Sequence, residues 1–457
     1  MVRPRALRLT VAAVIAACLA VVPLAGQGPA GEFTLALTGD SIITRRLSVY
    51  AEPAFTRLID LVRSADAAFT NIEMLFHDFE PYPMNESGGT YMRAEPALAK
   101  ELAWAGFDLG SLANNHTGDY GVLGMRLTKK YVAEAGIVAA GAGDSLAEAR
   151  EAKFLETAKG RVALISVAST FPDHSRAGRT RGDVPARPGL SPLRFTTTYV
   201  VTRDRFEQLR QTAGEITGTT PAAGDTLTFV GRRFVVGTTP GIRTEPRAED
   251  VAEIAAVVKS ARTLADTVIV TIHAHEGGKT RLEPAEFLVT FARAMIDAGA
   301  DLFVGHGPHV LRGIEVYKGA PILYSLGDFI FQNETLLRYP ADNYDDQRLG
   351  PAATPDDYLN RRYNFDKSGF PADPPIWESV VAMPRYRAGR LVELALHPIS
   401  LGFGAARQVR GRPMLATPEL GGKILGDLTR LSAPFGTRIS VRDGVGYVEL
   451  PAASSQR

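Results

Sequence analysis

The sequence predicts an α/β fold, and two observations lead to this prediction. Short apolar runs of strand length alternate with segments that carry apolar residues at helical spacing. Proline near a first helical turn and glycine after a last one mark the ends of these segments, as with Pro53 and Pro96 and with Gly106 and Gly136. Strands that alternate with helices of this length are typical of the α/β class.

The predicted elements follow one another from residue 33 onward. The first part alternates strands at 33–39, 67–73 and 107–113 with helices at 52–66, 94–106 and 122–136. The pattern returns with a strand at 267–273, a helix around 287–296 and a strand at 301–306. The C-terminal part is predicted to hold strands and one helix, at about 420–433.

The expected organisation is one main domain at 32–338 with an insertion at about 172–246. The insertion is rich in Gly, Pro, Thr and Arg, and residues 339–376 show so little periodicity that we predict an irregular loop there. Segments this long are usually functional loops or excursions from the core. Residues 377–457 are expected to complete the domain as a small β-rich extension with one helix.

Residues 1–31 have the layout of an export signal. Three arginines precede an apolar stretch that ends near residue 24, which is shorter than the ~20 residues that a spanning helix usually needs. We therefore expect an exported protein, in the periplasm, outside the cell or anchored to the envelope. Cys18 lies in IAAC, which resembles a lipoprotein box, so a lipid at Cys18 and plain cleavage near residue 31 both stay open.

Charge and cysteine content exclude several functions. With 51 basic against 50 acidic residues, the overall charge balance does not indicate binding to nucleic acid or to a membrane surface. We expect an anionic substrate or polymer as the partner, no nucleic acid, and membrane contact only through a lipid on Cys18. Because Cys18 is the only cysteine, the folded part has no disulfides and no thiolate metal sites.

Polar side chains collect where the predicted strands end. Carboxyl ends of strands in an α/β sheet open onto one crevice, where ligands bind. In chain order, the residues at five such ends are Asp40; Asn71 and Glu73; Asn114, Asn115 and His116; His273, His275 and Glu276; and His306 and His309.

Each of these residues also has an ordinary structural explanation. Asp and Asn commonly cap helices or close turns, and a single histidine such as His116 commonly lies hydrogen-bonded under a loop. The H-x-H of His273 and His275 directs both rings to one side of a strand, which is moderately specific for a metal. Five of the eight histidines lie at strand ends beside Asp, Asn or Glu, and one metal site explains all five together.

The donor types limit which metal is bound. Imidazole, carboxylate and amide oxygen without thiolate favour Mn²⁺, Fe or Zn²⁺ over Cu(I) or an all-oxygen Ca²⁺ cage. The donors outnumber what one ion can use. We therefore predict two divalent ions that share a carboxylate, since paired ions ~3.5–4 Å apart commonly serve displacement at phosphorus.

The order of these motifs resembles the bacterial capsule-synthesis protein family CapA, tied to poly-γ-glutamate capsule biosynthesis, in the calcineurin-like metallophosphoesterase superfamily. The matching motifs are GD at Asp40, NIE at Glu73, NNH at 114–116, the histidine at 273, GHGPHV at 305–310 and GAPILYSLGDFIF at 319–331. The resemblance spans about residues 33–331. It implies a four-layer α/β sandwich of the metallophosphoesterase type.

The resemblance also implies roles for individual residues. These are Asp40 on one metal, Glu73 as the bridge, Asn115, His273 and His306 around the other metal, His309 back on the first, and His116 as the acid beside the leaving group.

Some positions depart from the superfamily pattern. Ser41 and Ile42 follow Asp40 where an Asp-x-His pair is usual, and the bridge is Glu instead of Asp. His275 replaces a common glycine and Asp328 a common asparagine. The residues predicted as an extra ligand or as partners that orient the ligands are Asn71, His275, Glu276 and Asp328.

Two functions of different classes stay open. The first is a metal-dependent phosphoesterase-like hydrolase, and the second is an accessory protein that binds an anionic capsule polymer and uses metal only structurally. Arginine suits repeated carboxylates or phosphates, although a solvated loop is the commoner role for such a segment. The arginines offered by residues 176–189 are Arg176, Arg179, Arg181 and Arg187.

Overall fold

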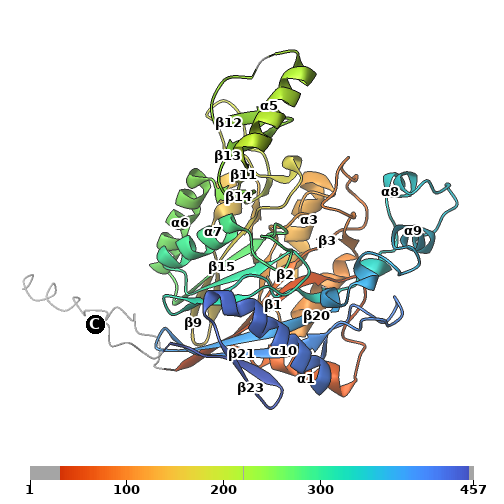
Figure 1. Ribbon diagram of the computed structural model, residues 1–457. Helices are drawn as coiled ribbons and strands as arrows, with labels where there is room; N and C mark the ends of the chain where they lie inside the picture. The colour runs from red at the N-terminus through yellow and green to blue at the C-terminus, as the bar shows by residue number, and fades with distance from the viewer. Residues whose placement is uncertain (1–30, 220, 452–457) are drawn as a thin grey trace, which may run out of the picture.

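The computed structural model describes residues 31–219 and 221–451. Strands and helices alternate along the described chain, which confirms the predicted α/β class (Figure 1). Residues 1–30, with the predicted export signal and Cys18, lie outside the described residues. Among the helices at 31–219 and 221–451, none is both long and apolar enough to cross a membrane.

The first large sheet has ten strands in the order β23-β24-β21-β20-β1-β2-β5-β6, with β19 beside β1 and β22 beside β21. Its strands β19, β1, β2, β5 and β6 are parallel, whereas the C-terminal strands β20 and β21 join antiparallel. The bounds are β1 (Glu32–Ile42), β2 (Ala67–Ile72), β5 (Leu109–Ser111), β6 (Val138–Ala140), β19 (Asp328–Phe331), β20 (Glu378–Arg387), β21 (Arg390–Ser400), β22 (Met414–Leu415), β23 (Ile439–Arg442) and β24 (Val445–Val448).

The second sheet has six strands in the order β17-β18-β16-β15-β9-β8. The central strands β9, β15, β16 and β18 are parallel, so their carboxyl ends lie at one edge. The bounds are β8 (Lys153–Thr157), β9 (Gly160–Ala168), β15 (Thr267–His273), β16 (Leu302–His306), β17 (Ile314–Tyr317) and β18 (Ala320–Leu323).

Apolar side chains bind the two sheets together and attach the helices to them. Leu37 and Phe69 of the first sheet share one buried cluster with Ile269 and Val304 of the second. Helices α1, α2 and α3 contribute to another cluster with the first sheet, and α6 and α7 to one with the second. The helix bounds are α1 (Pro53–Arg63), α2 (Ala99–Ala105), α3 (Gly121–Glu134), α4 (Leu146–Arg150), α6 (Ala248–Arg262), α7 (Glu286–Asp297) and α10 (Pro418–Ser432).

The predicted helix faces are confirmed. The apolar residues of α1 that repeat at helical spacing are all buried, and so are those of α7. Gly106 follows α2 with φ of 107°, a left-handed conformation that favours glycine over residues with a side chain.

Residues 195–246, within the predicted insertion, form a small unit with its own sheet, at the top of Figure 1. Four strands in the order β12-β13-β11-β14 pack on α5, and Phe206, Ala213 and Leu227 are buried between them. The bounds are β11 (Phe195–Val201), α5 (Arg203–Thr217), β12 (Thr226–Phe229), β13 (Arg232–Val236) and β14 (Gly241–Pro246).

The structure corrects the prediction of an irregular loop at 339–376. This segment holds α8 (Ala341–Asp346) and α9 (Pro355–Arg362), at the right of Figure 1. Thr354 and Asp357 form a capping box at the start of α9. Helices of six and eight residues complete at most about two turns, too few for apolar periodicity to show.

The remaining short elements connect these layers. Strand β3 pairs with β4, and β7 pairs with β10. Their bounds, with those of the 3-10 helices, are β3 (Leu75–Phe76), β4 (Arg93–Ala94), β7 (Ala142–Gly143), β10 (Gly189–Leu190), η1 (Pro96–Leu98), η2 (Asp173–Ser175), η3 (Asn333–Thr335), η4 (Phe370–Ala372), η5 (Pro374–Trp377) and η6 (Ala433–Phe435).

Candidate metal centre

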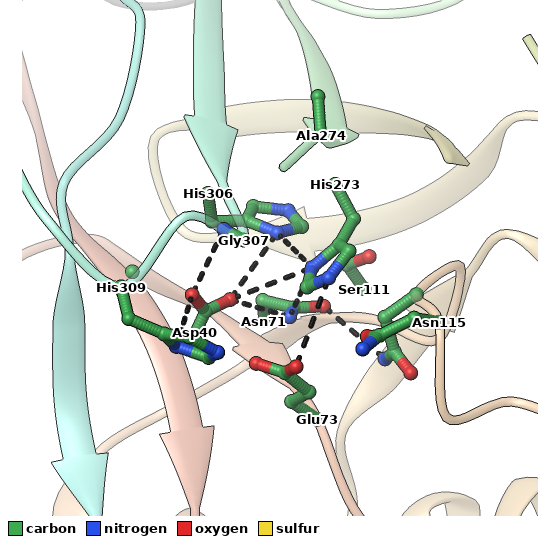
Figure 2. Close-up of polar contacts among 12 residues, drawn as sticks. Asp40, Asn71, Glu73, Ser111, Asn115, His273, Ala274, His306, Gly307 and His309 are labelled. Atoms are coloured by element: carbon green, nitrogen blue, oxygen red, sulfur yellow. Dashed lines mark hydrogen bonds and ion pairs between the residues drawn. The ribbon is translucent and has the colours of Figure 1, made fainter. Parts of the chain in front are cut away.

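Strand register brings the predicted ligands into one buried cluster, drawn in Figure 2. Asp40 of β1 lies beside Asn71 of β2 and beside Asp328 of β19. His273 and His306 end the paired strands β15 and β16 in register. All five side chains are buried, so their polar groups must find partners inside the protein.

Asp40 is the centre of the cluster. Its Oδ1 accepts a 2.7 Å hydrogen bond from Asn71 Nδ2, and its Oδ2 accepts one of 2.9 Å from the Gly307 amide. The Nδ1 atoms of His306 and His273 lie 3.4 and 3.6 Å from Asp40 Oδ1 and 3.1 Å from each other. Asp40, His273 and His306 thus form a group that could hold a metal ion.

Glu73 brings a second carboxylate to the cluster. Neither Glu73 Oε1 nor Oε2 has a hydrogen bond from any described residue, although the side chain is fully buried. His116 Nε2 and His273 Nε2 each lie 3.7 Å from Oε1. Asn115 is similar, because its Nδ2 donates to Gly88 O at 2.9 Å while its buried Oδ1 lacks a partner in the described chain.

His275 and His309 complete the nitrogen donors. His275 Nε2 lies 2.9 Å from His273 Nε2, and these two histidines form a second possible metal group with Glu73. A third group consists of Asp40, Glu73 and His309. His309 Nδ1 forms a 2.8 Å hydrogen bond with Asp328 Oδ1, so Asp328 orients this ring. The other Asp328 oxygen is buried without a hydrogen-bond partner among residues 31–219 and 221–451.

The turn between His306 and His309 needs glycine. Gly307 has φ of 115°, and a Cβ at this position would lie 2.9 Å from the Ala274 amide nitrogen. His309 itself has φ of 57°, an uncommon value for a residue with a side chain. Such strain recurs at functional sites, where the surrounding structure holds it in place.

His116 has a partner that sequence reasoning missed. Its Nδ1 bonds Asp119 Oδ2 at 2.7 Å, and Asp119 also accepts hydrogen bonds from the amides of Gly88 and Met92. This leaves His116 Nε2 facing Glu73. The spacing of three residues between His116 and Asp119 could have suggested this contact. In a turn of that length, however, the spacing alone does not show which side chain the carboxylate contacts.

The other predicted residues lie in different places. Glu276 turns toward Ser169 and Thr170, whose hydroxyls donate to it at 2.7 and 2.9 Å, so it belongs to none of the metal groups found in the described chain. Asn114 holds the turn, since its Oδ1 accepts from the His116 amide and its Nδ2 donates to Ile72 O.

The predicted arginines are not gathered at the cluster. Arg179 pairs with Glu253 of α6, and Arg181 Nε lies 2.9 Å from Asp183 Oδ1. Arg176 lies 3.8 Å from Asp173, and Arg187 Nε donates to the Arg176 carbonyl. Three of the four charges therefore have an acidic neighbour.

Burial shifts the pKa values of several groups in the cluster. Burial raises the pKa of Glu73 well above its usual range, and the nearby charges of Asp40 and Asp328 raise it further. Burial raises the pKa of Asp328 to about 7, against 3.8 for the free group. Burial lowers the pKa of His273 to about 4, so this ring is neutral at pH 7 and one of its nitrogens has a free lone pair.

These features fit a bound divalent cation. Buried acceptors without hydrogen bonds are costly, and a cation would satisfy those of Glu73 and Asn115 at once. Imidazole nitrogens combined with carboxylate and amide oxygens suit Mn²⁺, Fe or Zn²⁺. The candidate ligands are Asp40, Glu73, Asn115, His273, His275, His306 and His309.

The sequence matches a described family over most of its length. Residues 34–333 match the family "Bacterial capsule synthesis protein PGA_cap". An uncharacterized protein of Sinorhizobium fredii, y4sH, is 40% identical over 92% of this chain and 93% of its own length. The capsule biosynthesis protein CapA of Bacillus anthracis is 24% identical over 66% of this chain and 60% of its own. A probable polyglutamine synthesis accessory protein of Mycobacterium tuberculosis is 28% identical over 48% of this chain and 44% of its own.

Among solved structures, the NAD nucleotidase of Haemophilus influenzae aligns with 88% of this chain and 56% of its own, at 9% identity and a TM-score of 0.30. A hypothetical protein of Thermus thermophilus aligns with 84% of this chain and 96% of its own, at 13% identity and a TM-score of 0.33. TM-scores this low do not establish a shared fold.

Proposed function

This chain belongs to the bacterial capsule synthesis protein family, and from that premise we propose that it is a metal-dependent, phosphoesterase-like hydrolase of capsule or poly-γ-glutamate biosynthesis. The observation that carries the proposal is the buried cluster in which Glu73 and Asn115 present acceptors without partners in the described chain, beside the His116–Asp119 pair. A protein that used these residues only for packing would pair those acceptors.

The fold supports the same class of enzyme. Helices contribute to apolar clusters with each of the two large sheets, and a further cluster joins the sheets to each other. We propose that this arrangement is the four-layer sandwich of the calcineurin-like metallophosphoesterases. The cluster then occupies the edge where the parallel strands β1, β2, β15 and β16 end.

The residues of the proposed site would bind the metal ions or hold the ligands in place. Bound divalent ions supply Lewis-acid chemistry and neutralise charge that develops on a phosphoryl group. Asn71 and the Gly307 amide hold both Asp40 oxygens in place, and Asp328 holds the His309 ring. We expect His275 to act as the extra ligand, since its Nε2 converges with His273 and Glu73.

His116 is the proposed general acid. Asp119 accepts a hydrogen bond from Nδ1–H and stabilises the positive charge when the ring also carries a proton on Nε2. From Nε2, that proton can pass to the alcohol that leaves the phosphorus. Near burial of the ring limits the access of water to it.

The alternative is a non-hydrolytic accessory protein that binds an anionic capsule polymer, with the metal only structural. The mycobacterial relative, a probable polyglutamine synthesis accessory protein, favours it. The arginine segment at 176–189 gives it little support, because Arg176, Arg179 and Arg181 already have acidic neighbours.

One experiment separates the two functions. The mature chain would be assayed for bound metal and then tested on phosphomonoesters, phosphodiesters and γ-glutamyl polymers. We expect metal-dependent turnover of a phosphoester. Cleavage of the polymer but not of any ester would overturn the phosphoesterase proposal, and polymer binding without turnover, unchanged in His116→Ala, would favour the accessory protein.

We also propose that the protein is exported, as the capsule relatives suggest for the envelope. Intact mass of the protein recovered from the envelope or the medium checks this. Loss of about the first 31 residues is expected for plain cleavage, and a lipid on Cys18 for an anchored form. Full-length protein confined to the cytoplasm would contradict export.

A further inference from the structure

Thr271 lies beside the metal centre but is not one of its candidate ligands. It is fully buried in β15, two residues before His273. Its hydroxyl donates to the Val304 carbonyl at 2.9 Å and also lies 2.8 Å from Nε2 of His306. A threonine hydroxyl has one proton to donate and can accept two hydrogen bonds.

If the Thr271 hydroxyl gives its one proton to the Val304 carbonyl, then the ring of His306 has to be the donor in the second contact. His306 then carries its proton on Nε2, and its Nδ1 has a free lone pair. Nδ1 is the atom that faces the cluster, 3.4 Å from Asp40 Oδ1 and 3.1 Å from His273 Nδ1.

We propose that Thr271 is a positioning residue that fixes the tautomer and orientation of His306, so that Nδ1 can bind the metal. The inference rests on the metal centre of the proposed function, but not on hydrolysis. Histidines that bind metals usually donate their other ring proton to an oxygen, and removing that oxygen typically weakens metal binding 10–100-fold.

The opposite arrangement makes a different prediction. If Thr271 donated to Nε2, then His306 would carry its proton on Nδ1, pointing at Asp40 and His273. Val304 O would lose the hydroxyl as a donor, and Nδ1 would be closed to a cation. The two arrangements therefore differ in which ring nitrogen is protonated.

The chain offers a matched control in Thr38. It is also fully buried, lies two residues before Asp40, and donates its hydroxyl to the Phe69 carbonyl of a neighbouring strand at 2.9 Å. Within the described residues its hydroxyl has no bond to an imidazole ring. Replacing Thr38 should lower the stability of the fold about as much as replacing Thr271, but it should not affect the ring of His306.

The experiment compares Thr271→Val, Thr271→Ser and Thr38→Val in the mature chain. Affinity for Mn²⁺ and Zn²⁺ would be measured by competition with a chelator, with thermal unfolding of each metal-free variant as the check on folding. We expect Thr271→Val to bind metal 10–100-fold more weakly. Thr271→Ser should stay within a few fold of the parent, and Thr38→Val should match the parent.

Imidazole ¹⁵N NMR of the metal-free parent gives the second readout. A His306 signal with the proton on Nε2, lost in Thr271→Val, supports the inference. A proton on Nδ1 in the parent, unchanged affinity in Thr271→Val, or an equal loss in Thr38→Val would each overturn it. If the expected metal effects occur in a chain that hydrolyses nothing, the inference stands and the hydrolase proposal falls.

Discussion

The two halves of the metal centre are built differently. In the half formed by Asp40, His273 and His306, neighbouring groups hold the ligands, as Asn71 Nδ2 and the Gly307 amide hold the Asp40 carboxylate. In the half formed by Glu73 and Asn115, three buried oxygens have no hydrogen bond within residues 31–219 and 221–451. The protein orients the first half, whereas the second half still needs a partner.

This difference indicates where a cation matters most to the protein. An unsatisfied buried polar group costs roughly 1–3 kcal/mol. Removal of metal should therefore disturb the Glu73 half more than the Asp40 half. Replacing residues of each half in turn tests that contrast.

Asp40→Asn should have the largest effect, because the Asp40 oxygens lie within 3.6 Å of a ring nitrogen of His273, of His306 and of His309. We expect loss of most bound metal and of hydrolysis without unfolding, as elemental analysis and circular dichroism would show. His306→Ala and His309→Ala should each reduce bound metal as well. Variants that kept full metal content and lost only thermal stability would make these residues part of the core instead.

His116→Ala should slow hydrolysis of an alkyl phosphoester by ~10²–10⁴ and leave metal content unchanged. A nitrophenyl ester should lose much less, because its leaving group departs without a proton. Asn115→Ala is the matched comparison, and it should lower metal occupancy and depress both substrates alike. Equal losses on both substrates for His116→Ala, together with lost metal, would remove the proposed acid.

Metal affinity should rise with pH through about 7. The folded-state pKa of Asp328, about 7, is above its unfolded value of 3.8, so the metal-free protein holds an extra proton between these values. The stabilising contribution of that proton is fully present below pH 3.8 and is lost as the pH rises through 7. Asp328 is not a candidate ligand, but a cation nearby favours its ionised form, so metal binding should release this proton and should weaken by up to about tenfold per pH unit below 7.

Asp328→Asn provides the control for that pH effect. Affinities measured by chelator competition at pH 6 and pH 8 should differ less in this variant than in the parent. The same pH dependence in both proteins would show that the displaced proton comes from another group, such as Glu73.

Glu73→Gln should change stability in opposite directions with and without metal. The pKa of Glu73 is raised in the folded state, so its stabilising contribution is present below the usual value of 4.5 and is lost at higher pH. At pH 8, the metal-free variant should therefore be more stable than the parent, by about 1–3 kcal/mol, and the metal-loaded variant less stable. Thermal unfolding with and without a chelator measures both.

Glu101→Gln is the matched control for that experiment. Glu101 accepts hydrogen bonds from the amides of Leu47 and Ser48, and hydrogen bonds to Ser48 and Arg46 outweigh burial and lower its pKa. Its replacement should destabilise the protein whether or not metal is present. Stabilisation of the metal-free chain by Glu101→Gln would show that the Glu73 result has nothing to do with the metal centre.

Arg181→Ala should have the smallest effect, because Arg181 is exposed and pairs only with its exposed neighbour Asp183 among the described residues. Such surface pairs contribute about 0–1 kcal/mol. Metal content and turnover should match the parent. A large loss of affinity for a γ-glutamyl polymer would support the accessory-protein function.

The α/β class, the buried faces of α1 and α7, and the donors near five strand ends could all be predicted from the sequence. These follow from periodicity and from residue order, which are local properties of the chain. Periodicity did not show α8 and α9, because a helix of six or eight residues offers too few apolar positions.

How the donors are used depends on the tertiary structure. Glu276 lies three residues beyond the end of β15, yet it turns to Ser169 and Thr170. Asp119 and Thr271, in contrast, hold the rings of His116 and His306. Which atoms meet depends on strand register and on the direction of each side chain, across separations such as the 35 residues between Thr271 and His306. The order of residues along the chain gives neither the strand register nor the side-chain directions. The types of ligand could therefore be predicted from the sequence, but the partners of each ligand could not.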